Sequence, residues 1–111
     1  MNQITFSDFA KIDMRVGTII HAEVFHEAKI QAFKVTIDFG EMGIKKTAAQ
    51  ITKRYQPEDI LGKQVVAVIN FPPKQIANFM SECLILGAVD DENSVSLVAP
   101  NHIMKNGLKI G

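Results

Sequence analysis

Hydrophobic and polar positions alternate with a period of two along much of the chain, which is the pattern of half-buried strands. Residues 33–39 show it best, since four apolar side chains would lie on one face of a strand and three polar side chains on the other. Nearly continuous apolar runs at 65–69 and 83–89 predict central strands covered on both faces. The other predicted strands are 16–24, 44–48 and 94–99, with turns at 40–43 and 90–93.

Signals for helix are few and short. Ser7 is placed to cap a turn or two of helix over residues 8–12. Residues 57–62 begin with proline and end with glycine, which predicts a single helical turn. Gly17, inside the first predicted strand, indicates a bend or a bulge.

Short, regularly spaced strands with turn signals between them predict an all-β fold. The strand count and the length of 111 residues fit a five-stranded barrel of the oligonucleotide/oligosaccharide-binding (OB) type, with short helical turns and extensions at both termini. An apolar fraction of 47% is typical of one globular domain, which we expect over residues 1–111. The chain opens without a signal-peptide pattern and contains no apolar run of membrane-spanning length, so we expect a soluble cytoplasmic protein.

Charged residues are unevenly distributed along the chain. The chain has no net charge, but residues 45–74 hold six Lys and Arg against two acidic residues, a local charge of +4. Such a segment is typical of a face that binds an anionic polymer, and a merely solubilising face is an equal alternative on charge alone. The basic residues that would contact phosphates are Lys45, Lys46, Lys53 and Arg54.

An apolar segment with few charges follows the predicted strand at 65–69, in a region that the pattern predicts to be a loop. An exposed apolar loop would suit an apolar peptide or a partner subunit. Phe71 and Tyr55 also offer planar surfaces for an unstacked base, although such rings more often lie in a core. The candidate peptide-binding residues are Phe71, Pro72, Pro73, Ile76 and Phe79.

The chain lacks the residue sets that catalysis or metal binding require. It has no nucleophile elbow and no phosphate-binding loop. His21, His26 and His102 are scattered, and residues 90–92 lack the spacing of a calcium loop, so they are expected in a solvated turn. Cys83 lies in an apolar run and is expected to be a buried structural thiol. We therefore predict no enzyme, no metal and no cofactor.

Five sequence blocks, in order and with compatible spacing, resemble the tRNA-binding-domain superfamily, and most closely its short stand-alone bacterial branch, the CsaA secretion chaperones. The resemblance runs from about Phe9 to Gly111. It implies an OB barrel, a homodimer, and binding either of tRNA, as in the wider superfamily, or of unfolded or preprotein chains, as in the CsaA branch. The blocks are 13–19, 35–40, 49–55, 70–77 and 81–87.

The resemblance also carries individual residues. It assigns Lys53, Arg54, Asn70, Lys74 and Ser81 to the RNA-facing side of the superfamily, whereas Lys45 and Lys46 rest on charge. The chain departs from that pattern at three places: residues 44–49 replace a Val-Ser-Gly type sequence, residues 31–33 replace a Lys-Leu pair and leave only Lys29 nearby, and Asn78 stands where relatives often have glycine. Asparagine tolerates positive φ, so a turn at Asn78 is compatible with the fold.

Two functions therefore remain open. The first is an export-related chaperone that holds apolar segments, with Lys53, Arg54 and Lys74 selecting polar or acidic flanks. The second is a protein that binds structured RNA such as tRNA through the same face, and the first two departures favour the chaperone. Apolar residues at 4–6, 103–104 and 108–110 are candidates for pairing with a second copy, although both ends could instead close the barrel.

Overall fold

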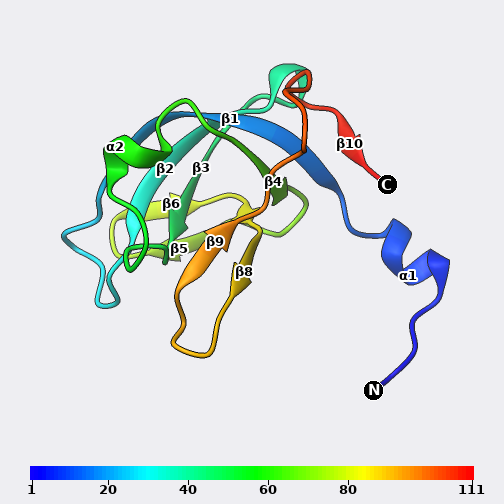
Figure 1. Ribbon diagram of the computed structural model, residues 1–111, viewed down its shortest axis with the longest axis horizontal. Coiled ribbons are helices and arrows are strands. Elements are labelled where there is room, and N and C mark those ends of the chain that lie inside the picture. The colour runs from blue at the N-terminus through cyan, green and yellow to red at the C-terminus, as the bar shows by residue number, and fades with distance from the viewer.

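The computed structural model describes residues 1–111 as a nearly closed five-strand antiparallel barrel, which confirms the predicted OB-like all-β fold (Figure 1). The main sheet has the strand order β3-β2-β1-β4-β7, and β10 also pairs with β1. Two hairpins, β5–β6 and β8–β9, extend from it. The elements are α1 (Phe6–Ala10), β1 (Met14–Val24), β2 (Phe33–Asp38), η1 (Gly40–Met42), β3 (Ile44–Ala49), α2 (Pro57–Ile60), β4 (Gln64–Val68), β5 (Lys74–Ile76), β6 (Phe79–Ser81), β7 (Leu84–Ile85), β8 (Gly87–Val89), β9 (Val95–Leu97) and β10 (Lys109–Ile110).

The alternation in β2 builds the core as predicted. Phe33, Val35 and Ile37 are buried on one face of β2, while the residues between them are partly exposed on the other. They pack with Ile19 of β1 and Val65 of β4 in one hydrophobic cluster. Each fully buried side chain of this kind contributes about 1.5–3 kcal/mol, so the barrel interior rests on β1, β2 and β4.

The barrel closes between β3 and the segment that joins β6 to β7. The Glu82 N–H donates to the Lys46 carbonyl at 2.7 Å, and the Thr47 hydroxyl donates to the Cys83 carbonyl at 2.7 Å. The Ala48 N–H donates to the Ser81 hydroxyl at 3.3 Å. Because a side chain accepts this last bond, the closing seam ends within β3.

Gly17 has a different role from the one predicted. The irregularity in β1 lies at residue 20, where the register with β2 shifts between Ile19 and His21. At Gly17, a Cβ atom would lie 2.5 Å from Ile37 Cγ2 and 2.7 Å from the Phe39 ring. Glycine is therefore required there for the close approach of β1 to the core rather than for a bulge.

The apolar run at 83–89 does not form one strand. It is divided at Leu86, so that β7 pairs with β4 while β8 pairs with β9. The Leu86 N–H donates to the Val66 carbonyl at 2.9 Å, and the Leu86 carbonyl accepts from the Val98 N–H at 3.1 Å. Leu86 therefore carries the chain from the barrel into a hairpin.

Residues 74–81 are not the expected loop but the β5–β6 hairpin. Its turn places Ala77 at φ 52°, whereas Asn78 is not among the residues with positive φ. The expectation that Asn78 takes up the positive φ of this turn is therefore wrong by one position. Two strands of three residues each are too short for a period-two pattern to be recognised.

The helical turns are close to their predicted places. Thr5, rather than Ser7, caps α1, since its hydroxyl accepts the Asp8 N–H and the Asp8 carboxylate accepts the Thr5 N–H. Pro57 begins α2 as expected. The pairing of β10 with Met14 and Arg15 agrees with the alternative in which the carboxyl-terminal end closes the barrel. None of the helices has the length and apolar composition needed to span a membrane.

Candidate polymer-binding clefts

A cleft of about 390 Å³ separates the β1–β2 connection from the β5–β6 hairpin, and we call it the hairpin cleft. Ala32 and Ala48 line it, and Ile30 and Ile76 supply larger apolar surface. Two ammonium groups also border it, because Lys29 comes from the β1–β2 connection and Lys74 from β5. Neither lysine forms an ion pair within the chain, so both are available to an anionic group.

An aromatic and cationic contact holds the β5–β6 hairpin on the barrel. The Phe79 ring meets the Phe25 ring edge-on, with centroids 5.3 Å apart. The Lys34 ammonium lies 5.0 Å from the centroid of Phe25 and 5.8 Å from that of Phe79. It also lies 3.8 Å from carboxylate oxygens of Glu23 and Glu27. Phe79, a predicted peptide-binding residue, is therefore half-buried in the contact that positions the hairpin.

The other predicted apolar residues divide into two groups. Phe71, which is 52% exposed, lies with Pro72 and Pro73 in the exposed connection before β5. Ile76 borders the hairpin cleft. Asn70 makes internal hydrogen bonds, because its amide oxygen accepts the Asp13 N–H at 2.9 Å and its amide nitrogen donates to the Lys11 carbonyl at 2.7 Å.

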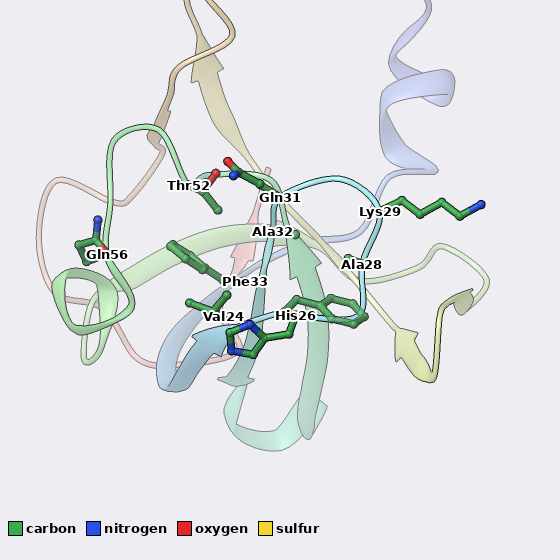
Figure 2. Close-up of a pocket in the computed structure, with 10 residues that line it drawn as sticks. Val24, His26, Ala28, Lys29, Gln31, Ala32, Phe33, Thr52 and Gln56 are labelled. Atoms are coloured by element: carbon green, nitrogen blue, oxygen red, sulfur yellow. The ribbon is translucent and has the colours of Figure 1, made fainter.

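A second cleft, of about 350 Å³, lies on the other side of the β1–β2 connection (Figure 2). Val24 and Phe33 supply its apolar lining, and Gln31 and Thr52 lie next to each other at its rim. Lys29, on the β1–β2 connection, lines both this cleft and the hairpin cleft. The β1–β2 connection is therefore a wall shared by two clefts.

A third cleft, of about 320 Å³, lies between the end of β3 and the β7–β9 region, and we call it the inner cleft. Its lining is mainly apolar, with Leu84 49% exposed and Val89 63% exposed. Ala49 and Ile51 line its other wall. The apolar run at 83–89 was interpreted as fully covered, so this cleft was missed. Residues 83–89 contain no polar residue that would mark an exposed face, so the sequence contains no signal for this cleft.

Lys53 and Arg54, the predicted phosphate contacts, are bound to the β8–β9 hairpin. A guanidinium nitrogen of Arg54 lies 3.7 Å from an Asp90 carboxylate oxygen, and the Lys53 ammonium donates to the Glu92 carbonyl. The adjacent Tyr55 hydroxyl accepts the Leu97 N–H at 3.0 Å. Both partners of the ion pair are half-exposed, so it adds little to stability, but it places the Asp90 carboxylate beside Arg54, while a backbone carbonyl accepts from Lys53.

The tip of the β8–β9 hairpin is ordered by Asp90. Its carboxylate accepts the N–H groups of Ser94 and Glu92, each at 2.9 Å. These two hydrogen bonds lower the pKa of Asp90, and the charges of Arg54 and Lys53 lower it further. The predicted turn at 90–93 is confirmed, and it is a partner of the basic segment as well as a solvated turn.

The remaining predicted RNA contacts lie near the beginning of β3. Lys45 and Lys46 are its second and third residues, whereas Lys53 and Arg54 follow its end. Ser81 Oγ lies 3.2 Å from Thr47 Oγ1 in the closing seam. Lys45 and Lys46 therefore lie near one end of β3, and Lys53 and Arg54 follow its other end.

Cys83 is a buried thiol, as expected. It is 6% exposed, and burial, together with the adjacent Glu82 charge, raises its pKa to about 12. No group of three or more potential metal-ligating side chains occurs.

The family model described as "Putative tRNA binding domain" matches residues 14–109. Chaperone CsaA from Bacillus anthracis strain Ames is 52% identical, with a TM-score of 0.94 over 99% of this chain and 100% of that one. This chain belongs to the tRNA-binding-domain family and is of the CsaA type. The CsaA chaperone protein of Picrophilus torridus is 46% identical, with a TM-score of 0.92 over 98% of this chain and 100% of that one.

Longer relatives contain the same domain as one part. A methionine–tRNA ligase of Methanocaldococcus jannaschii is 36% identical over 110 residues, which is 99% of this chain but 17% of the ligase. This chain therefore spans about a sixth of that relative. The CsaA-type family is a binding family rather than a catalytic one, and the match to the ligase concerns an appended domain.

Proposed function

We propose that this protein is a cytoplasmic, export-related chaperone that binds unfolded or preprotein segments as a homodimer. The observation that carries the proposal is the pair of apolar clefts around the end of β3, the hairpin cleft and the inner cleft. The CsaA chaperones, which are similar over the whole chain, support it. The exposed Phe71-Pro72-Pro73 connection extends the apolar surface near the hairpin.

Apolar burial explains how such clefts hold an unfolded chain. Each square ångström of apolar surface removed from water contributes about 25 cal/mol, whatever the sequence that provides it. The ammonium groups of Lys29 and Lys74 add attraction for acidic flanks. Because most of the affinity is apolar, binding to unfolded segments should be weak and tolerant of salt.

The homodimer is supported by the two ends of the chain. Figure 1 shows α1 and the residues before it outside the barrel. Helix α1 has no buried residue, Phe6 is 81% exposed and Ile103 is 85% exposed. An amphipathic end with no cover within the chain is typical of an interface. Sedimentation at low micromolar concentration is expected to give a dimer, and only a 12.3 kDa species would remove this part of the proposal.

Binding of structured RNA such as tRNA is the second candidate, because OB folds bind oligonucleotides between the loops that flank the barrel. The hairpin cleft occupies this position, with Lys29 and Lys74 beside it. The family match and the tRNA ligase relatives favour this function as well. Against it, Arg54 and Lys53 face Asp90 and Glu92 of the same chain.

Two titrations separate these functions. One uses a fluorescent, reduced and carboxymethylated protein that stays unfolded, and the other uses labelled tRNA, each across a salt series. The proposed chaperone binds the unfolded probe with little dependence on salt, whereas phosphate contacts make tRNA affinity fall steeply.

Variants assign the two activities to residues. Phe71→Ala should weaken binding of the unfolded probe, and intact binding would contradict an apolar site at this segment. Unchanged tRNA binding in the double variant Lys53→Glu and Arg54→Glu would remove these two cations from the RNA model. Lys63→Glu, an exposed lysine outside the clefts, is the matched charge control.

A further inference from the structure

One edge of β3 is closed only along part of its length. On the side away from β2, the Lys46 N–H donates to a Glu82 carboxylate oxygen at 2.9 Å and the Lys46 carbonyl accepts the Glu82 N–H. The Ala48 N–H reaches only the Ser81 hydroxyl. In an antiparallel ladder, the Ala48 carbonyl and both backbone groups of Gln50 face this same side.

These last three groups lack a strand partner. Gln50 makes no backbone–backbone hydrogen bond, and on this side the Ala48 carbonyl meets only the Thr47 hydroxyl, at 3.4 Å. An acceptor, a donor and a second acceptor therefore follow one another along the edge. An edge of this kind is a template for pairing with another extended chain.

A cleft lies on each face of this edge. Ala48 and Gln50 line the hairpin cleft. All four residues from Ala48 to Ile51 line the inner cleft, and among them Ala49 and Ile51 point to the other face of β3 and border the inner cleft alone. Ile30 and Ile76 make the first cleft apolar, and the residues of β7–β9 make the second apolar. A fourth cavity, of about 650 Å³, continues past Gln50 to Lys53, Val89 and Val95.

We infer that the open edge of β3 at residues 48–51 binds an extended polypeptide segment by strand addition, with its alternate side chains entering the hairpin cleft and the inner cleft. The inference rests on the proposed function and specifies the form in which a client is held. Main-chain hydrogen bonds supply affinity without reading sequence, and each of the two clefts receives every second side chain of the segment. This combination suits many different unfolded chains.

The charges around the edge define the preferred client further. Lys29 and Lys74 border the hairpin cleft without an ion-pair partner, while its one carboxylate, Glu27, lies 3.8 Å from Lys34. The segment bound is therefore an alternating apolar one with an acidic residue on the side of the hairpin cleft. A nucleic acid would satisfy the lysines but would place no apolar side chain in the inner cleft.

The decisive experiment changes the ligand and leaves the protein intact. Three peptides of about ten residues, with alternating Val and Thr and one terminal Glu, are compared by fluorescence anisotropy: one unmodified, one N-methylated at two even amides and one at two odd amides. Only one of the two registers directs its N–H groups to β3. Methylation in that register should lower the affinity by about tenfold or more, and methylation in the other should change it by less than about threefold.

The outcomes separate this inference from the proposed function. Equal effects of the two methylations, or binding of the unfolded protein without binding of the unmodified peptide, would overturn strand addition while leaving the chaperone intact. Failure of both the peptide and the unfolded protein to bind would overturn both. Displacement of the peptide by tRNA but not by the unfolded protein would assign the edge to RNA and overturn the inference.

A measurement on the protein provides the second arm. Peptide binding should slow hydrogen exchange of the Gln50 amide by about tenfold or more, since that N–H gains a partner. Leu84→Asp places a charge in the inner cleft and should abolish peptide binding, whereas Leu61→Asp, at a residue that is 56% exposed and outside the clefts, should not. Unchanged Gln50 exchange at saturating peptide would contradict the inference. This exchange measurement uses the original chain and so does not depend on the folding of any variant.

Discussion

Two pairs of basic residues in this molecule differ in their surroundings. Lys53 and Arg54 face Asp90 and the Glu92 carbonyl of the β8–β9 hairpin. Lys29 and Lys74 stand beside the hairpin cleft with no ion-pair partner. A ligand must compete with an internal acid at the first region but not at the second. The availability of a cation, rather than its presence, therefore decides where an anionic group binds.

The largest effect is expected from detaching the hairpin that carries Lys74. Phe79→Ala removes the ring that packs on Phe25 and Lys34, and it should lower the free energy of unfolding by about 1–3 kcal/mol. It should also abolish ligand binding at the hairpin cleft. Phe71→Ala, at an exposed ring, should lower the unfolding free energy by less than about 0.5 kcal/mol. Urea denaturation of both variants measures the difference, and equal destabilisation would contradict the anchoring role of Phe79.

A charge reversal compares the two regions directly. Lys74→Glu should reduce the affinity for a peptide with an acidic flank by about tenfold at low salt, because it replaces an available cation with an anion. Arg54→Glu should have a smaller effect, since Asp90 already offsets that guanidinium. Anisotropy titrations with Lys63→Glu as control test this order. A larger loss in Arg54→Glu would reverse the comparison.

Removing the internal acid should make the first region resemble the second. Asp90→Asn leaves Arg54 without its carboxylate, so the affinity for tRNA should rise by about two- to fivefold at low salt and return to the original value at about 500 mM salt. A filter-binding titration with Asp91→Asn as the matched control measures the change. An equal gain in both variants would show a general charge effect instead of release of Arg54.

The smallest effect concerns pH. The pKa of Asp90 is lowered in the folded chain, first by hydrogen bonds from Ser94 and Glu92. Its contribution to stability is therefore present above the ordinary carboxyl value of 3.8 and is lost as pH falls through the lowered pKa. The amide resonances of Ser94 and Glu92 should titrate below that ordinary value. Titration at or above it would mean that the tip of the hairpin is not held by Asp90.

Local patterns determine the parts of the fold that were predicted correctly. The alternation in β2 specifies one buried face and needs no information from elsewhere, and the proline of α2 marks a helix start by itself. The division at Leu86 is different, because it depends on hydrogen bonds to Val66 and Val98, which lie far away in the sequence. Period-two reasoning cannot detect a strand that changes its partner.

The same distinction applies to the candidate site. Ile76 and Lys74 were predicted as binding residues and do border the hairpin cleft. The pairing of Arg54 with Asp90 joins residues 36 positions apart, and only the folded chain brings them together. The open edge at Gln50 was not predicted either, because an unpaired backbone group leaves no mark on the side-chain pattern.

The most direct test of the central claim is one titration of the fluorescent unfolded protein at about 50 and 500 mM salt, using the original chain, Leu84→Asp and Leu61→Asp. Binding through the apolar clefts at the end of β3 predicts an affinity that changes by less than about threefold with salt, is lost in Leu84→Asp and is retained in Leu61→Asp. Unimpaired binding by Leu84→Asp, or binding that disappears at the higher salt, would contradict the account.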